Sequence, residues 1–228
     1  MKNIVFINAS PKTTDKSLSK HLNEMVSREF DRSRSCQSFI EPRKSLANHT
    51  TLDDFNKLTE ADAVVIAFPL YFYGLPGILM RFLEDYYQFT MVQGKPSKNP
   101  KVYAIINCGF PEPEINRDAL RVIGSFCRQI NAQFRFGVLI GGGGMLLETK
   151  EAGFMKKTKQ TLEKAFAKIA QDTQDHHLEK IDTIHIVIKF PKVLFKIMGS
   201  LNWIQAAHKN GLKKKDLYRQ PYRLYLDR

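Results

Sequence analysis

The sequence contains few of the residues that hold metals or cross-links. Its 228 residues include three cysteines, Cys36, Cys108 and Cys127, and no C-x-x-C pair. This wide spacing excludes an iron–sulfur cluster held by a compact cysteine group. The histidine pair at 176–177 and His185 have no metal-ligand spacing either. We therefore predict no metal site.

Long apolar segments and the commonest nucleotide-binding motifs are also missing. No stretch of the sequence is apolar and long enough to span a bilayer, and we recognise no signal peptide. Together with the unpaired cysteines, this predicts a protein of the reducing cytoplasm. Neither G-x-x-x-x-G-K-S/T nor G-x-G-x-x-G occurs, which excludes a Walker loop and the dinucleotide fingerprint.

The first thirty residues have the pattern of a strand, a hydroxyl-rich loop and a helix. The apolar run at 4–7 has no alternation, which is typical of a strand buried on both faces. Apolar residues then recur at helical spacing from Leu18 to Phe30. The N-terminus of such a helix attracts anions, so this segment indicates a phosphate site. The alternative is that the Ser and Thr residues merely cap the helix.

A second segment repeats this arrangement with aromatic residues in the loop. A buried strand at 64–67 is followed by three consecutive aromatics at 71–73, and Pro76 then opens another helix. Large aromatic side chains at the end of a strand favour a flat ring that stacks against them. Ordinary packing beneath the loop is the alternative.

Together the two loops resemble those of the flavodoxin-like NAD(P)H-dependent FMN reductases. In that family S-P-R/K followed by S-x-S/T binds the FMN phosphate, and P-x-Y after an Ala-Asp-led strand surrounds the isoalloxazine ring. This chain departs from the family where Arg81 stands nearest the expected lysine. The resemblance covers about residues 1–170. It assigns the FMN phosphate to Ser10, Lys12, Ser17, Leu18 and Ser19, and the ring to Pro69, Leu70, Tyr71, Phe72 and Tyr73.

The order of elements predicts the same fold independently. Further strands are expected at 38–40, 102–106 and 134–140, with helices between them. Alternating strands and helices imply a parallel sheet covered on both faces. We therefore expect an α/β, three-layer flavodoxin-like sandwich with a five-stranded parallel sheet over residues 1–180. Ligands of such sheets bind beyond the carboxyl ends of the strands, at the point where strand order reverses.

A third loop, after the fourth strand, is expected to complete the site. The backbone N–H groups of Asn107, Cys108 and Gly109 would reach the polar edge of the flavin, although a simple turn is the alternative. Cys108 itself is expected to be buried and inert. The four glycines at 141–144 either lie beside the cofactor or form a flexible turn.

The resemblance implies an oxidoreductase in which FMN accepts electrons from NADH or NADPH and passes them to a small acceptor. Candidate acceptors are free flavin, a quinone, an azo or nitro compound, or a protein. We find no convincing Ser-His-Asp set or carboxylate pair, so no side chain is assigned a catalytic role. Two alternatives remain open: a flavodoxin-type electron carrier, and a cofactor-free binding module that acts through its tail.

That tail, residues 181–228, is expected to be a basic, amphipathic, helical extension that follows a strand-like run at 184–188. From Lys189 onward the sequence contains ten Lys or Arg residues and two Asp residues. This gives a net charge of +8 out of the total of +12. Packing on the core or on a second copy in a homo-oligomer, burying Phe195 and Trp203, is the first interpretation. Peripheral contact with an anionic membrane is the second. Nucleic-acid binding has charge and aromatics in its favour but no motif, and we do not predict it.

Overall fold

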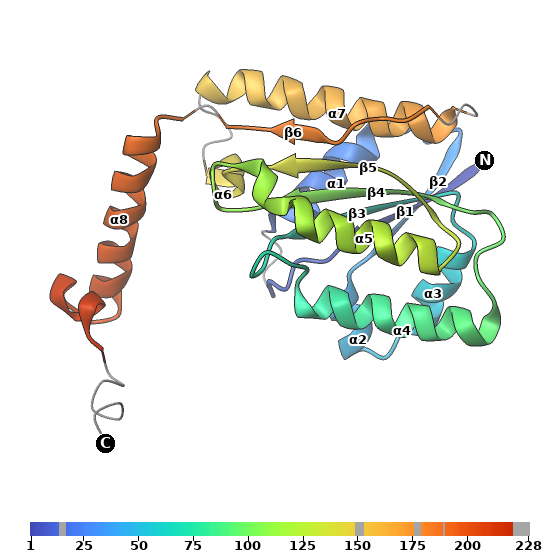
Figure 1. Cartoon of the computed structure of the whole chain (residues 1–228), viewed down its shortest axis with the longest axis horizontal. Helices are drawn as coiled ribbons and strands as arrows, with labels where there is room; N and C mark the ends of the chain where they lie inside the picture. Colours follow the sequence, from blue (N-terminus) through green and yellow to red (C-terminus); the bar gives the residue numbers. More distant parts are fainter. Residues whose placement is uncertain (14–16, 149–152, 176–178, 189, 221–228) are drawn as a thin grey trace. The chain divides into compact units, whose positions relative to one another are not determined.

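The computed structural model describes residues 1–13, 17–148, 153–175, 179–188 and 190–220 (Figure 1). The chain divides into two compact units, Met1–Ile188 and Lys189–Arg228. The first unit holds the sheet and most of the helices. The second holds one long helix and a short 3-10 helix, and it is described by itself below.

The first unit is built on a parallel sheet with strand order β2-β1-β3-β4-β5-β6. The predicted flavodoxin-like α/β fold is thus confirmed, but the predicted number of five strands is wrong. The sixth strand belongs to the segment assigned to the extension, and it pairs with β5 from Val138↔Ile184 to Ile140↔Ile186. The strands are β1 Lys2–Asn8, β2 Ser35–Ile40, β3 Ala63–Pro69, β4 Lys101–Asn107, β5 Gln133–Ile140 and β6 Ile184–Ile186.

The central strands have the composition that burial on both faces requires. In β1 the apolar run is at most 2 % exposed, and every residue of β3 before its terminal proline is buried. The strand β6 has only three residues, and it lies inside the run at 184–188 that is strand-like in sequence. Its place in the sheet depends on pairing with β5, which the sequence does not reveal.

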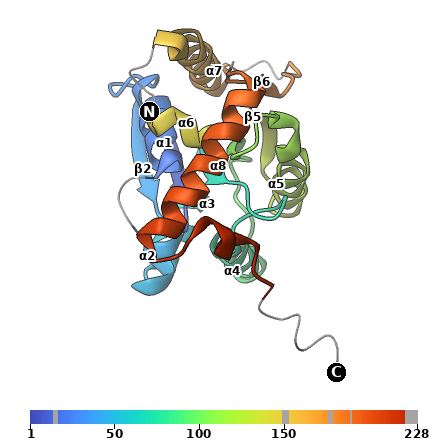
Figure 2. The same ribbon diagram turned by 90° about the vertical axis from the view of Figure 1, so that its left-hand side faces the viewer.

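Helices cover both faces of this sheet (Figures 1 and 2). α1 contacts β1 and α7, whereas α5 contacts β4 and β5 on the opposite face. The helices are α1 Leu18–Arg28, α2 Pro42–Ala47, α3 Thr51–Thr59, α4 Gly77–Gln93, α5 Arg117–Gln129, α6 Gly143–Glu148, α7 Lys156–Gln174 and α8 Lys192–Lys209, with 3-10 turns η1 Pro113–Asn116, η2 Gly153–Met155 and η3 Lys214–Tyr218.

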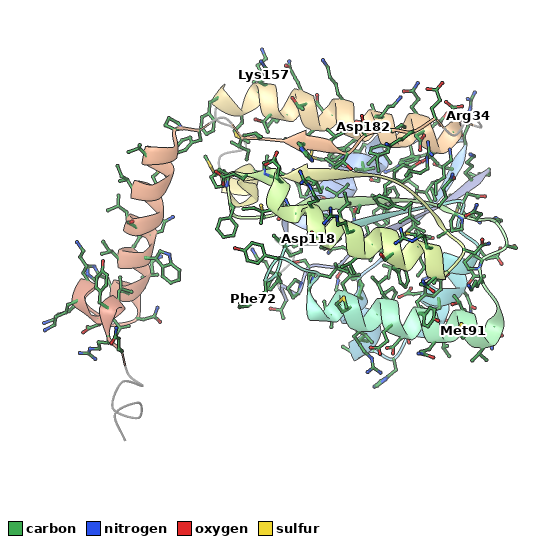
Figure 3. The ribbon with its side chains drawn as sticks, viewed as in Figure 1. Arg34, Phe72, Met91, Asp118, Lys157 and Asp182 are labelled. Atoms are coloured by element: carbon green, nitrogen blue, oxygen red, sulfur yellow. The ribbon has the colours of Figure 1, made fainter. Side chains whose placement is uncertain are left out.

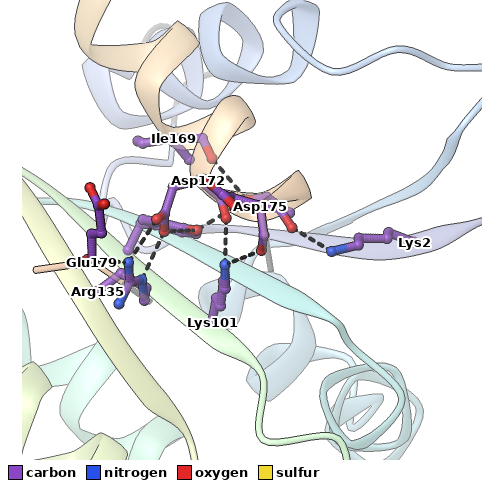
Figure 4. A network of polar contacts seen from close by, with 9 residues as sticks. Lys2, Lys101, Arg135, Ile169, Asp172, Asp175 and Glu179 are labelled. Atoms are coloured by element: carbon purple, nitrogen blue, oxygen red, sulfur yellow. Dashed lines mark hydrogen bonds and ion pairs between the residues drawn. The ribbon is translucent and has the colours of Figure 1, made fainter. Parts of the chain in front are cut away.

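A buried ionic network holds the end of α7 against the amino edge of the sheet (Figure 4). Arg135 donates two hydrogen bonds to the Asp172 carboxylate, at 2.9 and 2.7 Å. The Tyr103 hydroxyl donates a third, at 2.7 Å. The ammonium groups of Lys2 and Lys101 donate to carbonyls of the last turn of α7, where the helix dipole favours cations. Lys2, Lys101 and Arg135 lie at or near the first residues of β1, β4 and β5. The network therefore fixes the end of α7 relative to these strands.

Within its described residues, 190–220, the second unit consists of α8 and η3, which contact each other. Its apolar side chains are largely exposed: Trp203 is 70 % exposed and Leu201 58 %. No helix in the described part of the chain combines the length and the apolar character needed to cross a membrane. The predicted burial of Phe195 concerns a side chain that lies outside the described part of the structure.

Candidate functional site

Three loops meet at the carboxyl edge of the sheet, because the strands that precede them are neighbours. β1 pairs with β3, and β3 pairs with β4. Backbone hydrogen bonds continue the ladder into each loop: Ala9 N–H donates to Ala67, Leu70 N–H to Asn107, and Cys108 N–H to Ile140. The sheet order 2-1-3 places the strand-order reversal between β1 and β3. All the residues predicted to bind the cofactor are in these loops, in the first turn of α1 or at the ends of β3 and β4.

In the first loop, Asn8 and two serines form a compact hydrogen-bonded cluster. Asn8 Oδ1 accepts from the Ser10 N–H at 3.3 Å and from the Ser17 hydroxyl at 3.4 Å. Ser17 Oγ accepts from the Lys20 N–H at 3.1 Å and caps α1. Ser10 Oγ accepts from the Lys12 N–H at 3.3 Å. Ser17 thus has the capping role that the alternative interpretation assigned to it, and capping leaves other donors of the helix terminus free.

Those remaining donors fit an anion. Among the described residues, no acceptor faces the backbone N–H groups of Leu18 and Ser19, although Ser19 is only 1 % exposed. The first turn of α1 contains no acidic side chain, and the Lys12 side chain is exposed to solvent. Backbone N–H groups at a helix N-terminus that have no acceptor within the described residues suit a phosphate.

The second loop is a two-residue hairpin turn made of aromatic side chains. Tyr71 and Gly74 exchange two backbone hydrogen bonds of 3.0 and 2.8 Å. The two central residues, Phe72 and Tyr73, have φ angles of 45° and 62°. Positive φ at both central positions is the mark of a type I′ turn, which normally takes Asn-Gly. Bulky residues are strained there.

The strained turn presents its rings to solvent. Phe72 is 102 % exposed, Tyr73 62 % and Tyr71 47 %, and Phe72 stands at the carboxyl edge of the sheet (Figure 3). Pro69 and Leu70 are half-buried beneath. Rings as exposed as those of Phe72 and Tyr73 contribute little to packing, so ordinary packing beneath the loop does not account for their strained backbone. A flat ligand that stacks on these aromatic rings would account for their exposure.

We predict opposite effects on stability and on ligand binding when the two central residues of this turn are replaced by the Asn-Gly pair that a type I′ turn normally contains. The double change Phe72→Asn with Tyr73→Gly suits the type I′ turn, so the free energy of unfolding should rise by about 1 kcal/mol or more. The affinity for a flat aromatic ligand should fall, since both rings are lost. Urea titration and flavin titration measure the two effects. A variant that gains stability and keeps its flavin affinity would remove these rings from the site.

The third loop is joined to the glycine run after β5. Gly143 N–H donates to the Cys108 carbonyl at 2.7 Å, and Gly142 N–H donates to the Phe110 carbonyl at 2.6 Å. A Cβ on Gly141 would lie 2.2 Å from the Pro111 carbonyl oxygen. The run at 141–143 is therefore a buried, close-packed support of the loop, which differs from the flexible turn considered as one alternative.

The polar groups of the third loop differ in what they can still bind. The Cys108 N–H, carbonyl and thiol all have partners inside the protein, and burial raises the pKa of the thiol despite a hydrogen bond from Asn116. Asn107 is 7 % exposed and its amide donates to the Phe68 carbonyl. Gly109 is exposed, and no acceptor among the described residues faces its N–H. Gly109 thus offers a donor to a ligand at this loop.

Sequence reasoning missed two supporting residues of the site. Asn8 holds the first loop through its side-chain carbonyl, and an Asn at a strand end before a loop is a recognisable signal for such a turn. Phe110, 52 % exposed, adds a further ring beside the third loop. Its position after Gly109 in a Pro-rich stretch had no pattern that would identify it.

Comparison with known proteins agrees with this architecture. Residues 2–136 match the model of a family described as having a flavodoxin-like fold. The chain therefore belongs to the flavodoxin-like family, which confirms the resemblance at that level. Among curated proteins, none matches the sequence.

Several solved structures share the fold at low sequence identity. An azoreductase from Bacillus anthracis is 15% identical with a TM-score of 0.53, over 75% of this chain and 100% of its own. General stress protein 14 from Treponema denticola, in complex with FMN, is 15% identical with a TM-score of 0.54, over 76% and 100%. The NAD(P)H:quinone oxidoreductase of Methanothermobacter marburgensis is 12% identical with a TM-score of 0.55, over 78% and 98%. At these identities the likeness shows the fold alone.

Proposed function

We propose that this protein is an FMN-dependent oxidoreductase that passes electrons from NADH or NADPH to a small-molecule acceptor. One observation carries the proposal: helix and loop N–H groups with no acceptor among the described residues, together with exposed aromatic rings, lie at the carboxyl edge of a flavodoxin-like sheet, beside its strand-order reversal. The solved relatives named as an azoreductase and a quinone oxidoreductase, and the one in complex with FMN, support the same class. The predicted cytoplasmic location and homo-oligomer stay predictions.

The proposed roles follow the three loops. The first loop and the first turn of α1 would hold the phosphate, with the N–H groups of Leu18 and Ser19 as direct donors. The Ser10 hydroxyl would add a donor, and the Ser17 hydroxyl, now 3.4 Å from Asn8 Oδ1, would turn to the phosphate. The turn at 71–73, with Pro69 and Leu70 beneath it, would border the isoalloxazine. Gly109 N–H would donate to the pyrimidine edge, and Asn107 and Cys108 would position that donor.

Bound FMN would supply the redox chemistry, since it accepts a hydride from a nicotinamide and passes electrons on. The protein would contribute orientation and electrostatics. A donor at the pyrimidine edge stabilises the negative charge that develops there on reduction. The aromatic turn would exclude water from one face of the ring. Burial raises the pKa of the Cys108 thiol, which disfavours the thiolate that nucleophilic attack requires.

The test is spectroscopic. The purified protein, supplied with FMN, should show bound-flavin absorbance that is bleached by NADH or NADPH and restored by a quinone or an azo dye. Bound flavin that nicotinamides do not bleach would indicate an electron carrier instead. Failure to bind FMN at all would contradict the proposal and favour a cofactor-free module.

We predict that the phosphate loop discriminates FMN from riboflavin. Ser10→Ala with Ser17→Gly removes two hydroxyls near the helix terminus, and Gly is a tolerated cap. Each hydrogen bond lost to a charged phosphate costs about 1.5–3 kcal/mol, so FMN affinity should fall at least tenfold. Riboflavin, which has no phosphate, should bind as before.

The matched control is Ser27→Ala on the same helix, whose hydroxyl donates to the Glu24 carbonyl one turn away. It should leave the affinity for both ligands unchanged. Equal losses of FMN and riboflavin affinity in the double variant would mean that Ser10 and Ser17 only support the loop.

A further inference from the structure

The unit Lys189–Arg228 has an apolar helix face that its own 3-10 helix does not cover. Val193, Ile197 and Leu201 recur every four residues on α8, so they share one face of the helix. They are 72 %, 50 % and 58 % exposed. The single tryptophan of the chain, Trp203, is 70 % exposed on the same helix. An exposed apolar stripe of this length marks an interaction surface.

The same unit carries a cluster of unpaired cations. Lys209, Lys213, Lys214 and Lys215 are exposed, and none pairs with a carboxylate in the described part of the chain. Asp216, the one acidic side chain described in this unit, pairs with Arg219 at 2.8 Å. The charge of the lysines is therefore not neutralised locally.

A groove joins the aromatic and the cationic groups. It has a volume of about 500 Å³ between α8 and η3 and is lined by Ser200, Trp203, Ile204, Lys214, Leu217 and Tyr218. Tyr218 is 77 % exposed. Trp and Tyr beside lysines, next to an apolar helix face, form the combination found at the interface between lipid headgroups and acyl chains.

We propose that the unit Lys189–Arg228 docks on the surface of an anionic lipid membrane, with the α8 face among the acyl chains and the lysines at the headgroups. Charge complementarity favours an anionic membrane over a second copy of the chain as the binding partner. The net charge of +8 within these forty residues is attracted to an anionic surface and repels another copy of the same unit. The protein then acts at a membrane surface. This inference does not depend on the flavin site.

Trp203 makes the proposal directly measurable, because its emission reports on this unit alone. The full-length protein is mixed with vesicles of phosphatidylcholine, or of phosphatidylcholine with phosphatidylglycerol. With the anionic vesicles at low salt, the emission should shift to the blue and the protein should sediment with the lipid. Neutral vesicles should give neither effect. Raising the ionic strength to about 1 M, where the Debye length is about 3 Å, should release the protein.

Two variants with the same change in net charge test where binding occurs. Lys213→Gln, Lys214→Gln and Lys215→Gln together should weaken vesicle binding roughly a hundredfold. The control changes three exposed lysines of α7, Lys157, Lys164 and Lys168, to Gln, and it should retain binding. Equal losses of vesicle binding in both variants would overturn the proposal and indicate non-specific attraction of the whole basic protein to the lipid.

Three other outcomes would also overturn it. Emission that is already blue-shifted without lipid, and that depends on protein concentration, would assign the α8 face to a second copy. Sedimentation with vesicles that the Lys213, Lys214 and Lys215 variant retains in full, without any change in Trp203 emission, would place lipid binding outside this unit. A Trp203 response to duplex DNA but not to anionic vesicles would assign the cations to nucleic acid.

Discussion

Replacing Asp172 by Asn should lower the free energy of unfolding by about 3–5 kcal/mol. The Asp172 and Arg135 side chains are 3% and 6% exposed, and removing one partner of a buried pair leaves an uncompensated charge. The Tyr103 hydroxyl would also lose its charged acceptor. Because the network fixes the end of α7, the loss should affect the cooperative unfolding of the whole first unit. Urea denaturation measures it.

The stabilisation by Asp172 should also depend on pH. Burial alone would raise the pKa of this carboxyl, but hydrogen bonds from Arg135 and Tyr103 and the nearby Lys101 outweigh burial and hold the pKa below its ordinary value of 3.8. A carboxyl with a depressed folded-state pKa stabilises the fold fully above its unfolded pKa and loses that effect as pH falls through the folded pKa. The difference in stability between wild type and variant should therefore be constant near neutral pH and shrink below about pH 4.

The control is Asp118→Asn, which removes an exposed ion pair with Arg121 in which the side chains are 74% and 73% exposed. Exposed pairs contribute about 0–1 kcal/mol, so this variant should unfold almost as wild type does. A loss for Asp172→Asn no larger than that of the control would show that the α7 network does not stabilise the fold.

Gly141→Ala should destabilise the protein by about 3 kcal/mol and weaken flavin binding together. The added Cβ would lie 2.2 Å from the Pro111 carbonyl oxygen and 3.1 Å from that of Phe110. Both are backbone atoms, so no change of rotamer relieves the clash, and overpacking of this kind costs about 1–3 kcal/mol or more. The third loop must move away, and it carries the Gly109 N–H proposed to reach the flavin. Thermal unfolding and FMN titration measure the two effects.

Gly144→Ala is the matched control within the same run. A Cβ there meets nothing within 4 Å, and Ala is the better helix former in α6 by about 1 kcal/mol. It should leave FMN affinity unchanged and stability equal or slightly higher. If Gly141→Ala behaved like Gly144→Ala, the run would be the flexible turn that the sequence also allowed.

Local patterns in the sequence were sufficient to predict individual strands and helices, because each of these elements is one continuous segment of the chain. Apolar runs without alternation predicted β1 and β3, because strands buried on both faces need no polar positions. Helical spacing from Leu18 onward predicted α1. The alternation of strands and helices then implied a parallel sheet, and a parallel sheet brings the ends of neighbouring strands to one edge. The candidate loops could therefore be named from the sequence, and their flavin-binding roles stay predictions.

Contacts between distant residues were decided only by the tertiary structure. The run at 184–188 is strand-like in sequence, but the place of β6 in the sheet depends on pairing with β5. Asp172 meets Tyr103 across 69 residues of sequence, and Gly141 meets Pro111 only because two loops pack together. The positive φ angles of Phe72 and Tyr73 arise from a hairpin that their own propensities disfavour. The sequence by itself determined which segments form the sheet and its loops, since periodicity is local. Which groups those loops leave free to bind a ligand was decided by long-range packing.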